Sequence, residues 1–339
     1  MTSDSNNVSH VALPSVCVVG SQDLEPFLAH AVRFGSLVAP ASDIAVIEVT
    51  GPGAVDCMQG LLTNDLERPG DKAFTYAALL TQKGMIVSDM WVARRGSDLT
   101  LFVPGAGLHP LTAALERSLP PRLARFEDAS GLRHVLRLVG PGSPDVVARA
   151  NLPEPGPGQI VERDSLVIGR PSYDGPFTVQ IECPQRDEPR LLKALATAGA
   201  EVSAQPALEL ARILRGWPRL GAEIDAKTLP QEVRYDEIGG LSYSKGCYVG
   251  QETVARLHFR GHANRRLVGL LWDAPPNPNA REVSLDGTNV GRISSLASLD
   301  HSNLHVGIAM IRREVDVGTS VLAGGLIATT AELPFQFER

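Results

Sequence analysis

The chain has 339 residues, of which 43% are hydrophobic and 21% are charged, and these fractions are typical of a soluble globular protein. Because one hydrophobic core rarely serves a chain of this length, we expect two or three domains. The net charge of −6 argues against a general nucleic-acid-binding protein. The cysteines are far apart and form no CxxC pair, which fits a reducing compartment and predicts no metal site: Cys17, Cys57, Cys183 and Cys247.

The chain shows no sign of membrane insertion or secretion. The longest uncharged stretch, 99–115, is interrupted by prolines and glycines, and irregular backbone does not cross a bilayer. The first ten residues are polar and lack a basic residue, unlike a secretion signal. We therefore expect a cytoplasmic protein without a membrane span, and a monomer.

Strands and helices are mixed in the first two-thirds of the chain. Apolar runs predict strands over 44–49, 85–92, 99–103, 134–139 and 178–182. Apolar residues at helical spacing predict helices over 54–62, 108–119 and 189–198. Residues 94–98 are typical of a hairpin connection, and 151–159 of a loop. Because no glycine fingerprint of a nucleotide-binding sheet is present, an α+β fold is favoured.

The pattern changes after Gly261. Short strands are predicted over 267–272, 289–294, 305–311 and 320–323, and the proline-rich segment 273–280 is a loop. Several short strands separated by turns indicate a small barrel or sandwich. The predicted divisions are a flexible N-terminal segment (1–20), a region of two α+β domains (21–262) and a C-terminal β domain (263–339).

The most informative motif is the run KGCYVGQE at 245–252. Two glycines bracket Cys247, and the cation of Lys245 would favour its thiolate form; a small buried residue beside a turn is the alternative. We expect Gly250 to precede a helix, so that Glu252 lies in the first turn, where the helix dipole stabilises a carboxylate. Tyr248 could stack on a flat heterocycle or simply pack.

A basic cluster follows the motif, and it suits either a solvated hinge or an anion-binding surface. Its members are Arg256, His258, Arg260, His262, Arg265 and Arg266.

The run 245–256, with Arg260 and Gly261, resembles the signature of the YgfZ family. These folate-binding relatives of the glycine-cleavage T-protein are implicated in assembling or maintaining iron–sulfur clusters. Other segments resemble the two branches in order, from about Ile44 to about Leu322: 47–54 with 61–65, 81–86, 212–225 with 229–232, and 290–295 with 305–309.

This resemblance implies a T-protein-like arrangement of three domains around a central folate cavity, with a C-terminal β-barrel. The cofactor would be tetrahydrofolate or another reduced folate, and the partners iron–sulfur client or assembly proteins. Cys247 and Lys245 are the candidate catalytic residues. The candidate folate-binding residues are Asn64, Asp89, Tyr248, Gln251, Glu252, Arg256 and Arg260. Arg260 or Arg265 would pair with the anionic glutamate tail of the folate.

Two positions depart from the T-protein pattern. Leu214 stands where T-proteins carry a glutamate that bonds the pterin, so Glu209 or Glu223 would have to substitute. Ser88 replaces the first of two paired aspartates, and whether the remaining Asp89 inherits a catalytic role is left open.

The resemblance therefore favours a folate-binding accessory protein for iron–sulfur proteins that acts through Cys247. A single cysteine cannot hold a stable cluster alone, so further ligands would come from a partner. The alternatives are an aminomethyltransferase of the glycine-cleavage type, a thiol enzyme in which His258 or His262 activates Cys247, and an interaction scaffold that binds no folate.

Overall fold

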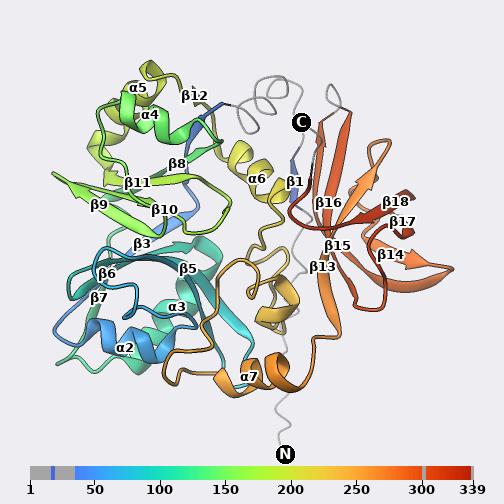
Figure 1. The fold of residues 1–339 in the computed structure, drawn as a ribbon, viewed down its shortest axis with the longest axis horizontal. Coiled ribbons are helices and arrows are strands. Elements are labelled where there is room, and N and C mark those ends of the chain that lie inside the picture. The colour runs from blue at the N-terminus through green and yellow to red at the C-terminus, as the bar shows by residue number, and fades with distance from the viewer. Residues whose placement is uncertain (1–16, 20–34, 300–302, 337–339) are drawn as a thin grey trace, which may run out of the picture.

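The computed structural model describes residues 17–19, 35–299 and 303–336. Three β structures are arranged around a central helix: a five-stranded sheet, a six-stranded sheet and a C-terminal barrel (Figure 1). This architecture confirms the predicted α+β class. Among the described residues, none of the helices has the length and apolar character that crossing a membrane requires.

The five-stranded sheet is antiparallel, with the order β4-β5-β6-β3-β7. Its strands are β3 (Ile44–Thr50), β4 (Phe74–Leu80), β5 (Ile86–Arg95), β6 (Asp98–Pro104) and β7 (Arg125–Asp128). Helices α2 (Ala54–Leu61) and α3 (Gly105–Ser118) cover one face, where their apolar residues join a buried cluster. The predicted β5–β6 hairpin and both helices predicted for this part of the chain are confirmed, because the turn residues of 94–98 and the local apolar spacing suffice to specify them.

The six-stranded sheet has the order β12-β2-β8-β11-β10-β9. Its strands are β2 (Leu37–Pro40), β8 (Arg133–Val139), β9 (Gln159–Arg163), β10 (Leu166–Arg170), β11 (Val179–Pro184) and β12 (Glu201–Val202). Helix α4 (Ser143–Arg149), the 3-10 turn η1 (Gln185–Asp187) and α5 (Glu188–Thr197) accompany it, and α4 and α5 contribute to its own apolar cluster.

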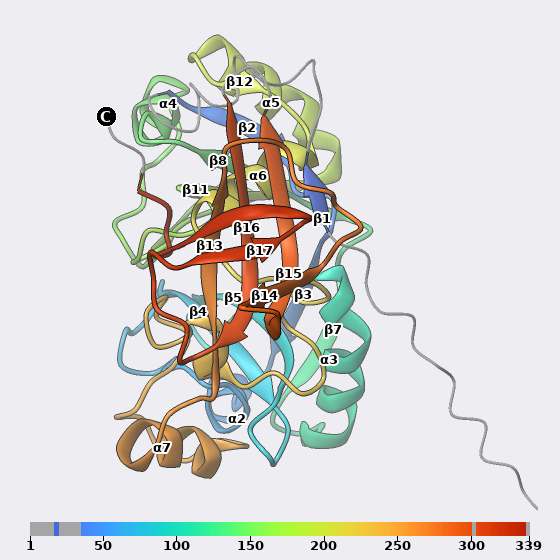
Figure 2. The same ribbon diagram turned by 90° about the vertical axis from the view of Figure 1, so that its right-hand side faces the viewer.

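The C-terminal β domain is a closed barrel. Its strands are β13 (Arg265–Trp272), β14 (Glu282–Leu285), β15 (Thr288–Leu299), β16 (Leu304–Arg312), β17 (Ser320–Ala323) and β18 (Leu326–Ala331). The ring closes because β15 pairs with both β14 and β16, and every pair in it is antiparallel (Figure 2). Within the predicted N-terminal segment 1–20, β1 (Cys17–Val19) pairs in parallel with β15; its other residues lie outside the described ranges.

The three β structures meet at α6 (Gln205–Leu214), which the sequence patterns did not predict. Every residue from Ala207 to Leu214 is buried, and the surrounding core cluster draws residues from both sheets and from the barrel. Aromatic rings fill the same core; those of Trp91 and Trp217 stack with centroids 5.9 Å apart. The 3-10 turn η2 (Pro230–Val233) and α7 (Gln251–Arg260) follow, and α7 lies beside the five-stranded sheet (Figure 1).

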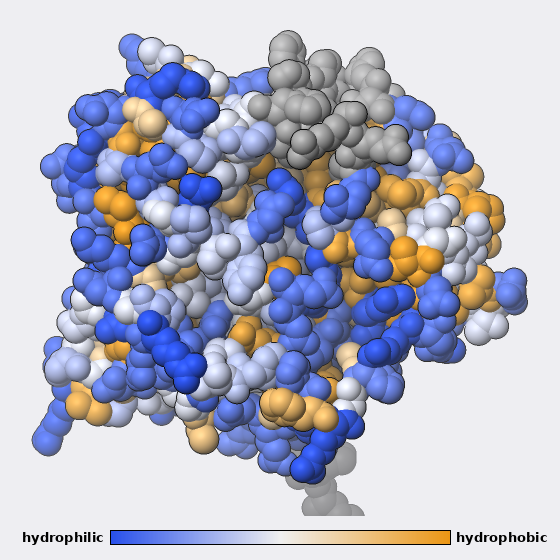
Figure 3. Space-filling view, in the orientation of Figure 1, coloured by the Kyte–Doolittle hydropathy of each residue, from blue (hydrophilic) through white to orange (hydrophobic). Residues whose placement is uncertain are grey.

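The surface is mostly hydrophilic, but apolar residues gather over the barrel (Figure 3). The large exposed apolar residues of the barrel are Leu271, Leu322, Leu326 and Ile327. They lie on β13 and on the β17–β18 hairpin.

Candidate functional site

A small central cavity lies where β4, β5, β8 and the segment after α6 approach one another. It encloses about 60 Å³, room for about two water molecules. Its polar lining includes Asp89 on β5, Tyr76 on β4, Arg137 on β8 and Glu209 on α6, and the ring of Trp217 lies against it. Carboxylates, guanidinium groups and aromatic rings thus converge from distant parts of the chain.

Asp89 is a buried acid of this cavity with a strongly shifted pKa. Its side chain is buried; Oδ2 accepts a 2.7 Å hydrogen bond from the Tyr76 hydroxyl, whereas Oδ1 has no partner among the described residues. Burial raises the pKa of Asp89 to about 6, although the Tyr76 hydrogen bond and the charge of Arg137 oppose the rise. Asp89 therefore changes charge near neutral pH and has one oxygen available to a donor in the cavity.

Ser88 faces away from the cavity, because neighbouring residues of a strand project to opposite sides. It is buried against α3, where a Cβ added to Gly107 would lie 2.3 Å from its Oγ. Ser88 therefore packs beneath α3, and of these two neighbouring residues only Asp89 lines the cavity.

The departure at Leu214 removes a polar group from the end of α6. Leu214 is buried in the central core and does not line the cavity. Of the two substitutes considered, Glu209 lines the cavity. Glu223 instead accepts hydrogen bonds from Ser294 and Ser295 of the barrel, at 2.9 and 2.6 Å.

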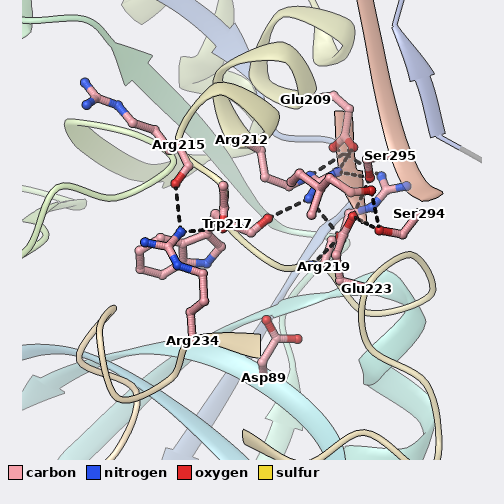
Figure 4. A network of polar contacts seen from close by, with 12 residues as sticks. Asp89, Glu209, Arg212, Arg215, Trp217, Arg219, Glu223, Arg234, Ser294 and Ser295 are labelled. Carbon is pink, nitrogen blue, oxygen red and sulfur yellow. Dashed lines mark hydrogen bonds and ion pairs between the residues drawn. The ribbon is translucent and has the colours of Figure 1, made fainter. Parts of the chain in front are cut away.

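Arg212 joins both glutamates into one buried network (Figure 4). Its guanidinium donates to Glu209 at 2.6 and 2.9 Å, to Glu223 at 2.9 Å and to Ser295 at 2.6 Å. Arg219 adds a longer contact of 3.3 Å to Glu209. The network links α6 to the barrel beside the cavity, and Figure 4 shows Asp89 near it but outside its hydrogen bonds.

Lys245 of the signature run is buried, and its ammonium group binds the end of α2. The Nζ atom donates to the backbone carbonyls of Gln59, Leu62 and Asn64, at 2.6 to 2.7 Å. Carbonyls at a helix C-terminus lack intrahelical partners and attract cations. Burial lowers the pKa of Lys245 to about 8. The ammonium therefore fixes the signature loop onto α2.

We expect Lys245→Met to destabilise the protein by about 2–3 kcal/mol, because it leaves buried carbonyls without a donor. Urea unfolding followed by circular dichroism would measure the change. Lys227→Met, which removes an exposed lysine, is the matched control and should leave the midpoint almost unchanged. Equal midpoints for the two variants would contradict this role.

The signature loop holds Cys247 at the surface. Cys247 is exposed, whereas Cys183 is buried and burial raises the pKa of the Cys183 thiol to about 12. The loop turns at Gly250, which has a φ of +83° and where an added Cβ would lie 2.5 Å from the Thr81 carbonyl oxygen. Glycine is required there, since other residues favour neither this conformation nor this approach. As predicted, Gly250 directly precedes a helix, α7.

The remaining candidate folate-binding residues lie outside the central cavity. Asn64 donates to the carbonyls of Tyr76 and Gly239, and so connects the end of α2 to the wall of the cavity. Tyr248 is buried, with the Lys245 ammonium 5.2 Å from its ring centroid. The others lie on α7: Gln251, half-buried, and Glu252, Arg256 and Arg260, exposed.

The basic cluster separates into groups with different surroundings. Arg265 forms a two-pronged ion pair with Glu232, at 2.8 and 3.0 Å. His258 stacks on the ring of Tyr243, with centroids 3.7 Å apart. Within the part of the chain that the structure describes, no hydrogen bond joins Cys247 to His258 or His262. The described residues also contain no group of three or more His, Cys, Asp or Glu side chains that could hold a metal ion.

Three residues of the cavity lining were not predicted from the sequence: Tyr76, Arg137 and Trp217. Tyr235, also not predicted, is outside the lining, and its hydroxyl oxygen lies 3.1 Å from that of Tyr76. Arg137 carried a usable signal, because it interrupts the apolar run of β8. Burial lowers the pKa of Arg137 to about 10, and its guanidinium lies 4.3 Å from the ring centroid of Phe177. A charged residue within a buried strand can indicate a polar site.

The fold and this central site define a T-protein-like protein. The structure of the glycine cleavage system aminomethyltransferase T from Bartonella henselae superposes with a TM-score of 0.78, at 21% identity, over 91% of this chain and 88% of that one. This similarity confirms the predicted arrangement. The chain belongs to the GCVT N-terminal domain family, which matches residues 29–238. The matched range contains Asp89 and α6 and ends before the signature run.

Relatives from both branches of this family match the chain at similar identity. An aminomethyltransferase of Frankia alni is 26% identical, over 86% of this chain and 82% of its own length. An iron-sulfur cluster assembly factor IBA57 homolog of Chaetomium globosum is 28% identical, over 68% and 55%. The tRNA-modifying protein YgfZ of Vibrio vulnificus is 25% identical, over 80% and 78%. Identity therefore places the chain in the family without separating its branches.

Proposed function

We propose that this protein binds a reduced folate in the central cavity and assists iron–sulfur proteins through Cys247. The observation that carries the folate part is the buried carboxylate of Asp89, a residue that lines the cavity and whose Oδ1 is unpartnered among the described residues. A buried acceptor without a partner is costly and is commonly satisfied by a ligand or water. The N–H groups of a reduced pterin are suitable donors to it.

The other lining groups fit the same ligand. Tyr76 and Trp217 offer aromatic faces for a flat ring. Arg137 lies near the Asp89 charge and suits an anionic group. The enclosed volume of about 60 Å³ is far below the 300 Å³ or more that small-molecule pockets usually have. Folate binding therefore requires the side chains around the cavity to move apart.

The accessory role rests on the signature loop and on the relatives. Cys247 is exposed on a loop that Lys245 anchors to α2, so a partner protein can reach the thiol. One relative carries the name of an iron-sulfur cluster assembly factor. An exposed thiol held on an ordered loop is suited to a transient ligand or adduct, with further ligands supplied by the partner.

We expect saturable binding of tetrahydrofolate and 5-formyltetrahydrofolate to the purified chain, measured by calorimetry. Cys247→Ala should leave this affinity unchanged, because the thiol lies outside the cavity. It should lower the activity of iron–sulfur enzymes in cells that depend on this protein; Cys57→Ala is the matched control. Full support by the Cys247→Ala protein would refute the thiol role, and an absence of folate binding would refute the cofactor.

A second function, aminomethyl transfer to tetrahydrofolate, is favoured by Asp89 itself. A carboxyl group with a pKa of about 6 is suited to proton transfer near neutral pH. The Frankia alni relative bears that activity as its name. Formation of methylenetetrahydrofolate from tetrahydrofolate and an aminomethyl donor would support this alternative, particularly if Asp89→Asn abolished it and Cys247→Ala did not.

A further inference from the structure

A second hollow, of about 530 Å³, lies between segment 222–228 and the barrel. It shares no lining residue with the central cavity. A neighbouring hollow of about 650 Å³ has Arg265 and Arg312 in common with it and adds His262 and Arg313. The most frequent charged residue in the walls of the first hollow is arginine: Arg265, Arg281, Arg292 and Arg312.

The strand register gathers three of these arginines, Arg265, Arg292 and Arg312, on neighbouring strands of the barrel. Arg265 on β13 lies directly opposite Arg312 on β16, and Arg292 on β15 lies opposite Met310. Met310 and Arg312 are two residues apart on one strand, so they project from the same face. Like charges directly opposite each other destabilise a sheet. Glu232 offsets this repulsion at Arg265, and Glu314 lies 3.9 Å from Arg312.

Two of the arginines have no hydrogen-bond or ion-pair partner among the described residues, although the charge of one, Arg292, acts on Asp225. Arg281 and Arg292 are half-buried, and neither side chain forms a hydrogen bond or ion pair with any described residue. By contrast, most of the acidic groups nearby are already engaged. Glu232 pairs with Arg265, Asp225 accepts bonds from Lys227 and Thr228, and Glu223 accepts bonds from Arg212 and two serines. The exception is Glu282 in the same wall: it is exposed and lies opposite Arg292 in the strand register, but no ion pair joins the two side chains.

The apolar part of the lining limits the kind of ligand. Val290 and Met310 contribute carbon surface beside the two unpaired guanidinium groups, so the hollow offers an apolar wall next to an anion-binding edge. Its volume lies within the range of small-molecule sites. A guanidinium group binds phosphate or carboxylate oxygens through paired hydrogen bonds, and partial burial strengthens them.

We propose that this hollow is a second ligand site, which binds a small organic anion carrying at least two negative charges on phosphate or carboxylate groups. Arg281 and Arg292 hold the charged groups, and Val290 and Met310 contact the body of the molecule. The site lies against Glu223, one of the partners of Arg212, so a bound anion would sit beside the junction of α6 and the barrel.

Calorimetry on the full chain, with pyrophosphate, ADP and citrate as probes, tests this proposal. We expect saturable binding of at least one probe, weakened by added salt because the contacts are ionic. Binding of pyrophosphate and ADP without citrate would assign the site to phosphates, and binding of citrate alone would assign it to polycarboxylates. Failure of all three probes to bind at low salt would overturn the proposal.

Variants locate the binding. Arg292→Gln and Arg281→Gln should each lower the affinity for the probe about tenfold or more, because each removes a charge-assisted hydrogen bond. Arg117→Gln, at an exposed position on α3, is the control and should bind like the unmodified chain. Unchanged affinity in both single variants would overturn the site. Tetrahydrofolate affinity should remain unchanged in all three variants, and its parallel loss in the Arg281 and Arg292 variants would show that folate and the anions share this hollow, so that it is not a second site.

Discussion

Asp89→Asn is expected to make the protein more stable above neutral pH while weakening folate binding. Because the pKa of Asp89 rises from 3.8 to about 6 on folding, the folded state favours the protonated acid. The associated stability is fully present below pH 3.8 and is lost as the pH rises through 6. This loss amounts to about 3 kcal/mol of unfolding free energy. The Asp89→Asn variant does not undergo it, because its amide does not ionise.

Unfolding free energies of the two proteins at pH 4 to 8 would measure this effect. The difference in favour of Asp89→Asn should grow between pH 4 and 7 and then level off. Asp65→Asn provides a control of opposite sign. Burial would raise the pKa of Asp65, but hydrogen bonds from the Arg68 and Glu67 backbone and from Gln59 lower it overall, so that variant should lose stability above pH 4. A pH-independent difference for Asp89→Asn would contradict the burial of a titrating acid.

The same substitution tests the cavity as a folate site. Removing the charge of a carboxylate that accepts an N–H bond from a ligand makes the binding free energy less favourable by about 1.5–3 kcal/mol. This change corresponds to an affinity about tenfold to hundredfold weaker. Calorimetric titration with tetrahydrofolate would measure the loss. Unchanged affinity together with the expected gain in stability would separate the buried acid from the ligand and refute the cavity as the folate site.

Arg212→Met is expected to destabilise the protein by about 3–5 kcal/mol. It removes the guanidinium that pairs with Glu209 and Glu223 and leaves their charges buried, which costs far more than the loss of a surface ion pair. Urea unfolding with circular dichroism would measure the shift. Arg215→Met is the matched control, three residues along the chain: its pair with Asp174 is largely exposed, so its removal should cost no more than about 1 kcal/mol.

A second substitution distinguishes loss of the charge network from loss of packing. Glu223→Gln added to Arg212→Met removes one of the unpaired charges, so the double variant should recover part of the stability. Arg212→Lys keeps the charge but lacks the planar fork, and we expect an intermediate loss. If the double variant were less stable than Arg212→Met by the full cost of Glu223→Gln alone, the two groups would be uncoupled and the network interpretation would be wrong.

Where the pattern of neighbouring residues specifies the local structure, the sequence alone predicted whether a segment forms a strand or a helix. Apolar runs and turn residues identified four strands of the barrel, β13, β15, β16 and β17, and the β5–β6 hairpin, and Gly250 marked the start of α7; β14 and β18 were not predicted. The pattern failed at α6, because Glu209 and Arg212 are buried beside apolar residues and interrupt the usual stripe. It also ended β15 early at 294, where Ser294 and Ser295 resemble turn residues but lie buried in the Arg212 network.

The sequence also identified the family through short motifs, since a signature depends on residue order alone. Only the tertiary structure decided how those residues are used. Lys245 precedes Cys247 in the chain, yet its ammonium binds carbonyls more than 180 residues away. Asp89 faces the cavity and Ser88 faces α3 because the strand is packed on both sides. Burial and long-range contacts set these roles, and the order of residues along the chain does not encode them locally.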